Sequence, residues 1–153
     1  MKVIRNFSTD TSKSILEKAA KFNFQNNDKP VQNFSDILNQ SGLLNKKINR
    51  ALVASSKILW LFNQEIIIMD NFNILALKSL NYKITEGNYD EYSEAWMTEY
   101  QKYSSKIKNI CSQLNNSSLD SNLLQMEWFQ KRIFDMFLWN SHYQENRIKK
   151  NDN

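Results

Sequence analysis

The sequence predicts an all-α protein whose long amphipathic helices pack as an antiparallel bundle or as coiled-coil-like hairpins. Its 153 residues include two glycines and one proline. A β-sandwich, a barrel or a Rossmann-type sheet needs many turns, and turns need these residues, whereas helix interiors need neither. Apolar residues also recur three and four positions apart along most of the chain, which is the spacing of one helix face. We expect two short helices in an N-terminal region, residues 1–42, and three longer ones in a main domain, residues 43–150, which is expected to form one structural unit.

The N-terminal region contains signals for two short helices. The first helix should begin near Thr9–Thr11, where several side chains can cap it, and should end in the polar stretch that leads to Pro30. The second should end at Gly42, which occupies the position after a helix that glycine favours. The apolar residues at helical spacing are Ile15, Leu16, Ala19 and Ala20 in the first helix, and Val31, Phe34, Ile37 and Leu38 in the second.

The main domain should start with one long helix, because no glycine or proline occurs from Leu43 to about Glu86. Apolar and small residues step by alternate fours and threes through this segment, which is a heptad-like stripe. A straight helix of this length would measure roughly 65 Å at 1.5 Å per residue. The sequence leaves open whether the helix is continuous. The stripe consists of Ile48, Leu52, Ser55, Leu59, Phe62, Ile66, Met69, Asn73, Ala76 and Leu80.

Two further helices are expected after this segment. Gly87 should end the long helix, and Asn88 or Asp90 should cap the next one, which runs near 89–114 with an aromatic-rich face. A capping box, a serine followed three residues later by an acid, is formed by Ser117 and Asp120. It should open a last helix that runs from about 118 to the mid-140s, with cations near its C-terminal end.

The stretch 58–77 is twenty residues long, which is enough for a helix to cross a bilayer. Glu65 and Asp70 would each cost a few kcal/mol there, so we do not expect an integral membrane span. As a helix, the segment has a narrow polar strip around Asn63 and a very wide apolar face. That face is either buried among the other helices or meets an external apolar surface. The four Trp, nine Phe and six Tyr of the chain suit both alternatives.

No pattern in the sequence predicts catalysis, a bound metal or a cofactor. His142 is the only histidine and Cys111 the only cysteine, so neither a catalytic triad nor a metal site with the usual spacing can be assembled. The lone cysteine and an N-terminus without an apolar signal segment fit a cytoplasmic protein. The net charge of +4 is mild, and the basic turns at 46–50 and 147–150 are read as solvated helix faces. We therefore do not expect an enzyme or a nucleic-acid partner.

Two stretches of the chain resemble the phasin family, small proteins that coat bacterial polyhydroxyalkanoate granules. "NRALVASSKILWLFNQEIIIMDNFNILALKSL", residues 49–80, is similar to the long first helix of the family, which is nearly free of glycine and proline. "NNSSLDSNLLQMEWFQKRIFDMFLWNSHY", residues 115–143, is similar to the second helix of the family. There a capped turn precedes a short motif of leucine, glutamine and an aromatic residue. The aromatic-rich helix near 89–114 departs from the family pattern.

The resemblance implies a non-enzymatic protein that adsorbs to the granule through its apolar side and keeps granules from coalescing. The alternative is a soluble helical-bundle module for protein–protein interaction or dimerisation. A homo-oligomer is expected in either case. The residues expected to contact the granule surface or a protein partner are Trp60, Phe62, Ile66, Met69, Phe72, Leu80, Trp128, Phe129 and Phe137.

Overall fold

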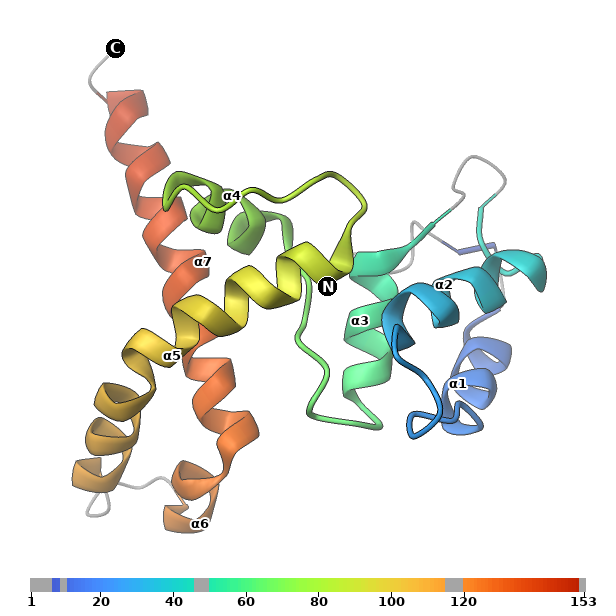
Figure 1. Ribbon diagram of the computed structural model, residues 1–153, viewed down its shortest axis with the longest axis horizontal. Helices are drawn as coiled ribbons and strands as arrows, with labels where there is room; N and C mark the ends of the chain where they lie inside the picture. The colour runs from blue at the N-terminus through green and yellow to red at the C-terminus, as the bar shows by residue number, and fades with distance from the viewer. Residues whose placement is uncertain (1–6, 9–10, 46–49, 115–119, 152–153) are drawn as a thin grey trace. The chain divides into compact units, whose positions relative to one another are not determined.

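The computed structural model describes residues 7–8, 11–45, 50–114 and 120–151, and this part of the chain is all-helical (Figure 1). The predicted fold class is therefore confirmed, whereas antiparallel or coiled-coil pairing stays a prediction. No helix within these ranges is long and apolar enough to cross a membrane, in agreement with the sequence. The helices are α1 (Ser12–Ala20), α2 (Pro30–Gln40), α3 (Leu52–Trp60), α4 (Asn71–Ser79), α5 (Tyr89–Gln113), α6 (Ser121–Gln125) and α7 (Glu127–Asn151).

The chain forms two compact units. Unit 1 comprises Met1–Met69 and Glu86–Asp90, and unit 2 comprises Asp70–Thr85 and Glu91–Asn153. Residues 43–69 thus belong to the same unit as the N-terminal helices, because α3 packs against α1 and α2. The boundary between the units therefore does not lie at residue 42, where the sequence analysis divides the chain.

The core of unit 1 lies between α2 and α3. Val31, Phe34 and Leu59 are completely buried there. Two buried serines anchor backbone amides that belong to no helix ladder: Ser35 Oγ accepts a hydrogen bond from the Ala51 N–H at 2.8 Å, and Ser56 Oγ accepts one from the Met69 N–H at 3.0 Å. These bonds satisfy buried donors, which would otherwise be costly.

Asp90 joins the first turn of α5 to α2 within unit 1. Its carboxylate pairs with Lys29 Nζ at 2.9 Å and accepts a hydrogen bond from Gln32 Nε2 at 2.6 Å. The Lys29 ammonium, as the main cause, lowers the pKa of Asp90. Tyr89 adds a second tie, since its hydroxyl donates to the Ile67 carbonyl at 2.7 Å.

The expected long helix over 43–86, whose continuity the sequence leaves open, is interrupted. Helix α3 ends at Trp60, residues 61–70 form turns and irregular backbone, and α4 begins at Asn71. Polar side chains explain the interruption, because they bond to nearby backbone and so compete with the helix. Asn63 Oδ1 accepts from the Glu65 N–H, and Asp70 Oδ1 caps α4 by accepting from the Phe72 N–H, both at 3.0 Å.

Helix α4 then ends well before the predicted stop at Gly87. Its last residue is Ser79, and Asn81 adopts a positive φ of 69°. The Tyr82 N–H bonds back to the Leu77 carbonyl at 3.1 Å. An asparagine in the left-handed conformation just past a helix end is the recognised alternative to glycine there.

Several predicted helix ends are confirmed. Gly42 follows α2 with a φ of 65°. Asn88 Oδ1 accepts from the Asp90 N–H at 3.1 Å at the start of α5, whose bounds match the prediction of 89–114 closely. The start of the last helical segment differs from the prediction: α6 begins at Ser121, and Asp120 is its cap, accepting from the Asn122 N–H at 2.9 Å, whereas Ser117, the predicted cap, lies outside the described residues.

The predicted last helix is divided into α6 and α7, because Met126 has extended backbone with a ψ of 128°. The side chain of Gln130 compensates for the lost helix bonds at this break: its Nε2 donates to the Leu124 carbonyl at 3.0 Å.

The core of unit 2 is aromatic and brings α5 and α7 together. Trp96, Tyr92 and Phe134 are almost completely buried. The rings of Trp96 and Phe134 meet edge to face with centroids 5.0 Å apart, and Tyr100 lies 5.5 Å from Phe134. Such pairs add specific geometry to the large apolar area they bury. Helix α4 packs against α7 (Figure 1).

Candidate interaction site on α4 and α7

A buried carboxylate network lies where α4, α5 and α7 meet in unit 2. Asp135 is 6% exposed, and its Oδ1 accepts hydrogen bonds from Trp96 Nε1 at 2.8 Å and from Asn73 Nδ2 at 3.1 Å. Its Oδ2 is paired with Arg132, one turn earlier on α7. We call these four residues the carboxylate network. Since its members come from three helices, the network links the elements of unit 2.

Burial raises the pKa of Asp135 to about 6, and the neighbouring charge of Asp70 adds to the rise. The Arg132 guanidinium and the Trp96 indole N–H oppose it, because both favour the ionised carboxylate. One atom of the network has no hydrogen-bond partner: Asn73 Oδ1 is a buried acceptor without a donor. An unsatisfied buried acceptor is costly, and its presence requires an explanation.

A second polar group attaches the segment after α4 to α5. The Tyr82 hydroxyl donates to Glu99 Oε2 at 2.8 Å, and Lys102 Nζ reaches the same oxygen at 2.6 Å. The hydrogen bond to Glu99, followed by the one to Tyr82, raises the pKa of Lys102 to about 12. Further along, the Thr85 N–H donates to Glu91 Oε2 at 2.6 Å. These bonds attach the residues that follow α4 to helix α5.

Exposed apolar side chains lie beside the carboxylate network. Phe72 and Leu75 of α4 are 39% and 46% exposed, and Met136 and Trp139 of α7 are 66% and 41% exposed. The rings of Phe72 and Trp139 meet edge to face with centroids 5.4 Å apart. Residues three apart on a helix are neighbours, so Leu75 adjoins Phe72 and Met136 adjoins Trp139. We call these four residues the apolar patch.

The carboxylate network positions the apolar patch. Asn73 follows Phe72 in the chain, and Asp135 precedes Met136. The hydrogen bond between Asn73 and Asp135 therefore holds α4 against α7 next to the patch residues of both helices. Rigid support of this kind keeps contact side chains in a defined arrangement.

The residues that the sequence analysis expects at a contact surface do not form one group. Ile66 and Met69 are buried in unit 1, Trp60 is partly buried, and Phe62 is 42% exposed. The others belong to unit 2, and of all nine only Phe72 is part of the apolar patch. Leu80 and Phe137 are exposed, and Trp128 and Phe129 are partly buried, with rings 5.9 Å apart.

Sequence reasoning missed Leu75, Met136 and Trp139. A signal for two of them exists in α7, where Phe134 and Leu138 are buried. Met136 and Trp139 lie off that buried stripe and are nevertheless apolar, which marks a second apolar side on the helix. Asp135 could not be found in this way, because its role depends on α4 and α5 packing around it.

Within the part of the chain that the structure describes, no group of three or more His, Cys, Asp or Glu side chains could hold a metal ion. The side chain of His142 lies outside that part. Cys111 is buried, and burial raises the pKa of its thiol. A buried thiol with a raised pKa is a poor nucleophile.

Comparisons with known proteins give no family for this chain: no protein-family model, no curated protein and no solved structure matches it. The fold and the site define an all-helical protein with a structurally supported apolar surface in unit 2. Function therefore has to be inferred from the chemistry of that surface.

Proposed function

We propose that this chain is a non-enzymatic helical interaction protein that binds a protein partner through the apolar patch. The observation that carries the proposal is that the solvent-exposed side chains of the apolar patch lie together on two helices that a buried hydrogen bond joins. Single exposed apolar residues are common on proteins, but contiguous ones beside ordered polar groups are typical of binding surfaces.

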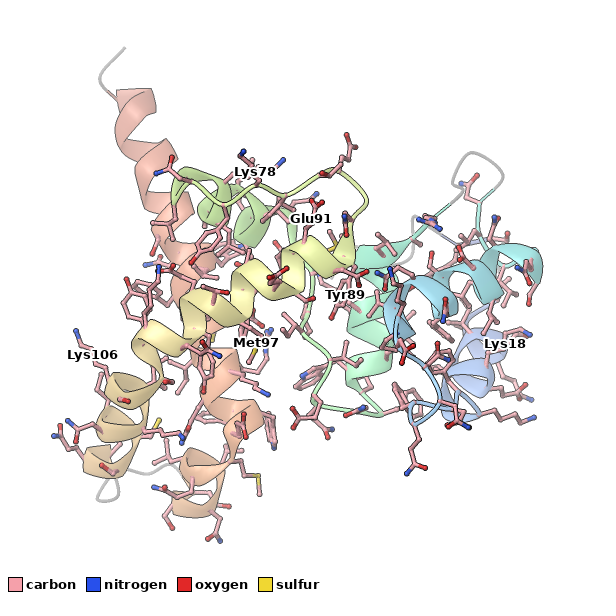
Figure 2. All side chains as sticks on the ribbon, in the orientation of Figure 1. Lys18, Lys78, Tyr89, Glu91, Met97 and Lys106 are labelled. Carbon is pink, nitrogen blue, oxygen red and sulfur yellow. The ribbon has the colours of Figure 1, made fainter. Side chains whose placement is uncertain are left out.

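The composition of the apolar patch favours a protein partner. Aromatic residues, methionine and arginine are enriched in protein–protein interfaces, and tryptophan is a frequent energetic hot spot. Arg132 lies one helical turn before Met136 and so borders the apolar patch. Lys78, exposed on α4 one turn after Leu75, adds a second cation on that helix (Figure 2). A second copy of this chain is one partner of this kind, which the expected homo-oligomer would require.

Coating of a polyhydroxyalkanoate granule, as the phasin resemblance implies, is a second candidate. Large apolar side chains are exposed in both units, among them Leu61 and Phe62 in unit 1 and Leu80 and Phe137 in unit 2. Burial of such groups yields about 25 cal/mol per Å², which is sufficient to drive adsorption to a polymer when many take part. The division of residues 49–80 into α3 and α4 separates them from the single long helix of that family.

Site-specific photo-crosslinking tests the first proposal. p-Benzoylphenylalanine is placed at Leu75 within the apolar patch or at Lys106, a control that is exposed on α5 and points into solvent (Figure 2). In the cells that naturally produce the protein, we expect a discrete crosslinked protein adduct from position 75 and a much lower adduct yield from position 106. Equal adducts from both positions, or none from position 75, would refute the proposal. An adduct between two copies of the chain would identify self-association.

Sedimentation with polyhydroxybutyrate particles tests the second candidate. If granule coating is correct, the wild type pellets with the particles, and Phe62→Ser and Phe72→Ser each reduce the pelleted fraction. These two substitutions change one exposed residue in each unit. Wild-type protein that stays in solution with the particles would exclude the granule role.

A further inference from the structure

We propose that Asp135 is a proton-operated latch between α4 and α7: its carboxylate pairs with Arg132, and its protonated form instead donates a hydrogen bond to Asn73 Oδ1. The latch itself does not depend on the proposed function. Its consequence for partner binding does, because that consequence acts through the apolar patch.

The ionised state is the arrangement that the structure shows. Asp135 Oδ1 accepts from Trp96 and Asn73, and Oδ2 is paired with the Arg132 guanidinium. In this state Asn73 uses its amide nitrogen as a donor, while its Oδ1 remains a buried acceptor without a partner. The network is therefore incomplete on the α4 side.

Protonation of Asp135 supplies the missing donor. A neutral carboxyl group has one O–H donor and a carbonyl acceptor, and a primary amide has the complementary pair. One of the two possible bonds, from Asn73 Nδ2 to Asp135 Oδ1, is already present at 3.1 Å. A proton taken from solvent onto Oδ2 allows the second bond, to Asn73 Oδ1, and removes the charge that pairs with Arg132.

The charged groups around Asp135 agree with a switch at mildly acidic pH. On α7, Arg132 favours the ionised form, while Asp70 at the start of α4 disfavours it. Helix α5 contributes the neutral indole of Trp96, and its nearby acid Glu99 is held by Tyr82 and Lys102. Burial dominates and places the pKa of Asp135 at about 6.

Loss of the ion pair changes the border of the apolar patch. Arg132 lies one turn from Met136 and so beside the patch. When Asp135 is protonated, its carboxyl group no longer neutralises the positive charge of Arg132. We expect an acidic partner to bind more strongly below pH 6 than above it, provided that the patch is a binding surface.

NMR titration of the purified protein from pH 4.5 to 7.5 tests the latch without any partner. The Asp135 carboxyl ¹³C signal should titrate with a midpoint near pH 6. The side-chain carbonyl ¹³C of Asn73 should move downfield at low pH with the same midpoint, because its oxygen gains a donor. An Asn73 signal that does not follow Asp135, or an Asp135 midpoint near 4, would overturn the proposal.

Asp135→Asn provides a second test, since its amide nitrogen takes the place of Oδ2 and mimics the protonated acid. We expect the Asn73 carbonyl signal of this variant to stay at the low-pH position throughout the range. Glu99→Gln, which alters another buried acid of unit 2, should show the same Asn73 transition as the wild type. Failure of Asp135→Asn to fold would still leave the wild-type titration to decide.

Discussion

At the scale of single residues, the environment of Asp135 determines how the stability of unit 2 depends on pH. The pKa of the carboxyl is about 6 in the folded protein, above its ordinary value of 3.8. Between these values the folded state binds more protons than the unfolded state, so stability falls as pH rises. This loss of stability is complete about one pH unit above 6, where the carboxyl is ionised in the folded state as well.

The corresponding prediction concerns chemical unfolding between pH 4 and pH 7. The difference between 3.8 and about 6 corresponds to roughly 3 kcal/mol, which the wild type should lose relative to Asp135→Asn as pH rises. Urea titrations of both proteins measure this difference, because titration of all other groups is common to both. A constant difference in unfolding free energy across the range would contradict the raised pKa.

A second residue-scale prediction concerns the indole donor to Asp135. Trp96→Phe keeps an aromatic ring in the core and removes the hydrogen bond of 2.8 Å. We expect this lost bond to cost about 1–3 kcal/mol at pH 7, where the carboxylate is ionised, and less at pH 4.5. The packing cost of the smaller ring is the same at both pH values, so the difference between them isolates the hydrogen bond. Equal losses at both pH values would show that the bond contributes little.

At the scale of elements, local caps decide where the helices of the central segment begin and end. Helix α4 depends on Asp70 at its start and on Asn81, with its positive φ, just past its end. Without these residues the apolar spacing would allow the helix to extend in both directions.

Substitutions of Asp70 test this dependence. Asp70→Ala should destabilise the protein by about 1 kcal/mol, because the Phe72 N–H loses its acceptor. Asp70→Ser is the matched control, since serine caps helices as well but carries no charge. Thermal unfolding of the two variants should therefore differ, with the alanine variant less stable. If both lose the same stability, the charge of Asp70 matters and the cap does not.

How far the elements follow from the sequence depends on the range of the interactions involved. The end of α2 is set by a local signal at Gly42 and the start of α5 by one at Asn88, so both positions were predictable. The break between α3 and α4 was not, because a heptad-like spacing persists through residues 61–70. There the Met69 N–H is held by Ser56 from an earlier helix, a contact that no local pattern reveals.

At the scale of the whole molecule, the chain forms two compact units, and each has its own core. The all-α class was predictable from the shortage of glycine and proline. The apolar patch was not, because it depends on the packing of α4 against α7, two elements about 60 residues apart in the sequence.

The patch residues should contribute to binding and little to folding. We expect Leu75→Ser and Met136→Ser each to change the unfolding free energy by less than about 1 kcal/mol, because both side chains are largely exposed. Phe134→Ala, in the buried core of the same unit, should cost about 3–5 kcal/mol. Thermal unfolding followed by circular dichroism compares the three variants. A large loss from the two serine variants would place these side chains in the core.

The most direct test of partner binding combines crosslinking with disruption of the apolar patch. The yield of the protein adduct from p-benzoylphenylalanine at Leu75 is measured in the native cells, with Met136 and Trp139 either unchanged or both replaced by serine. If the patch is the binding surface, the yield falls at least tenfold while the helical content stays the same. An unchanged adduct in the folded double variant would show that the partner binds elsewhere.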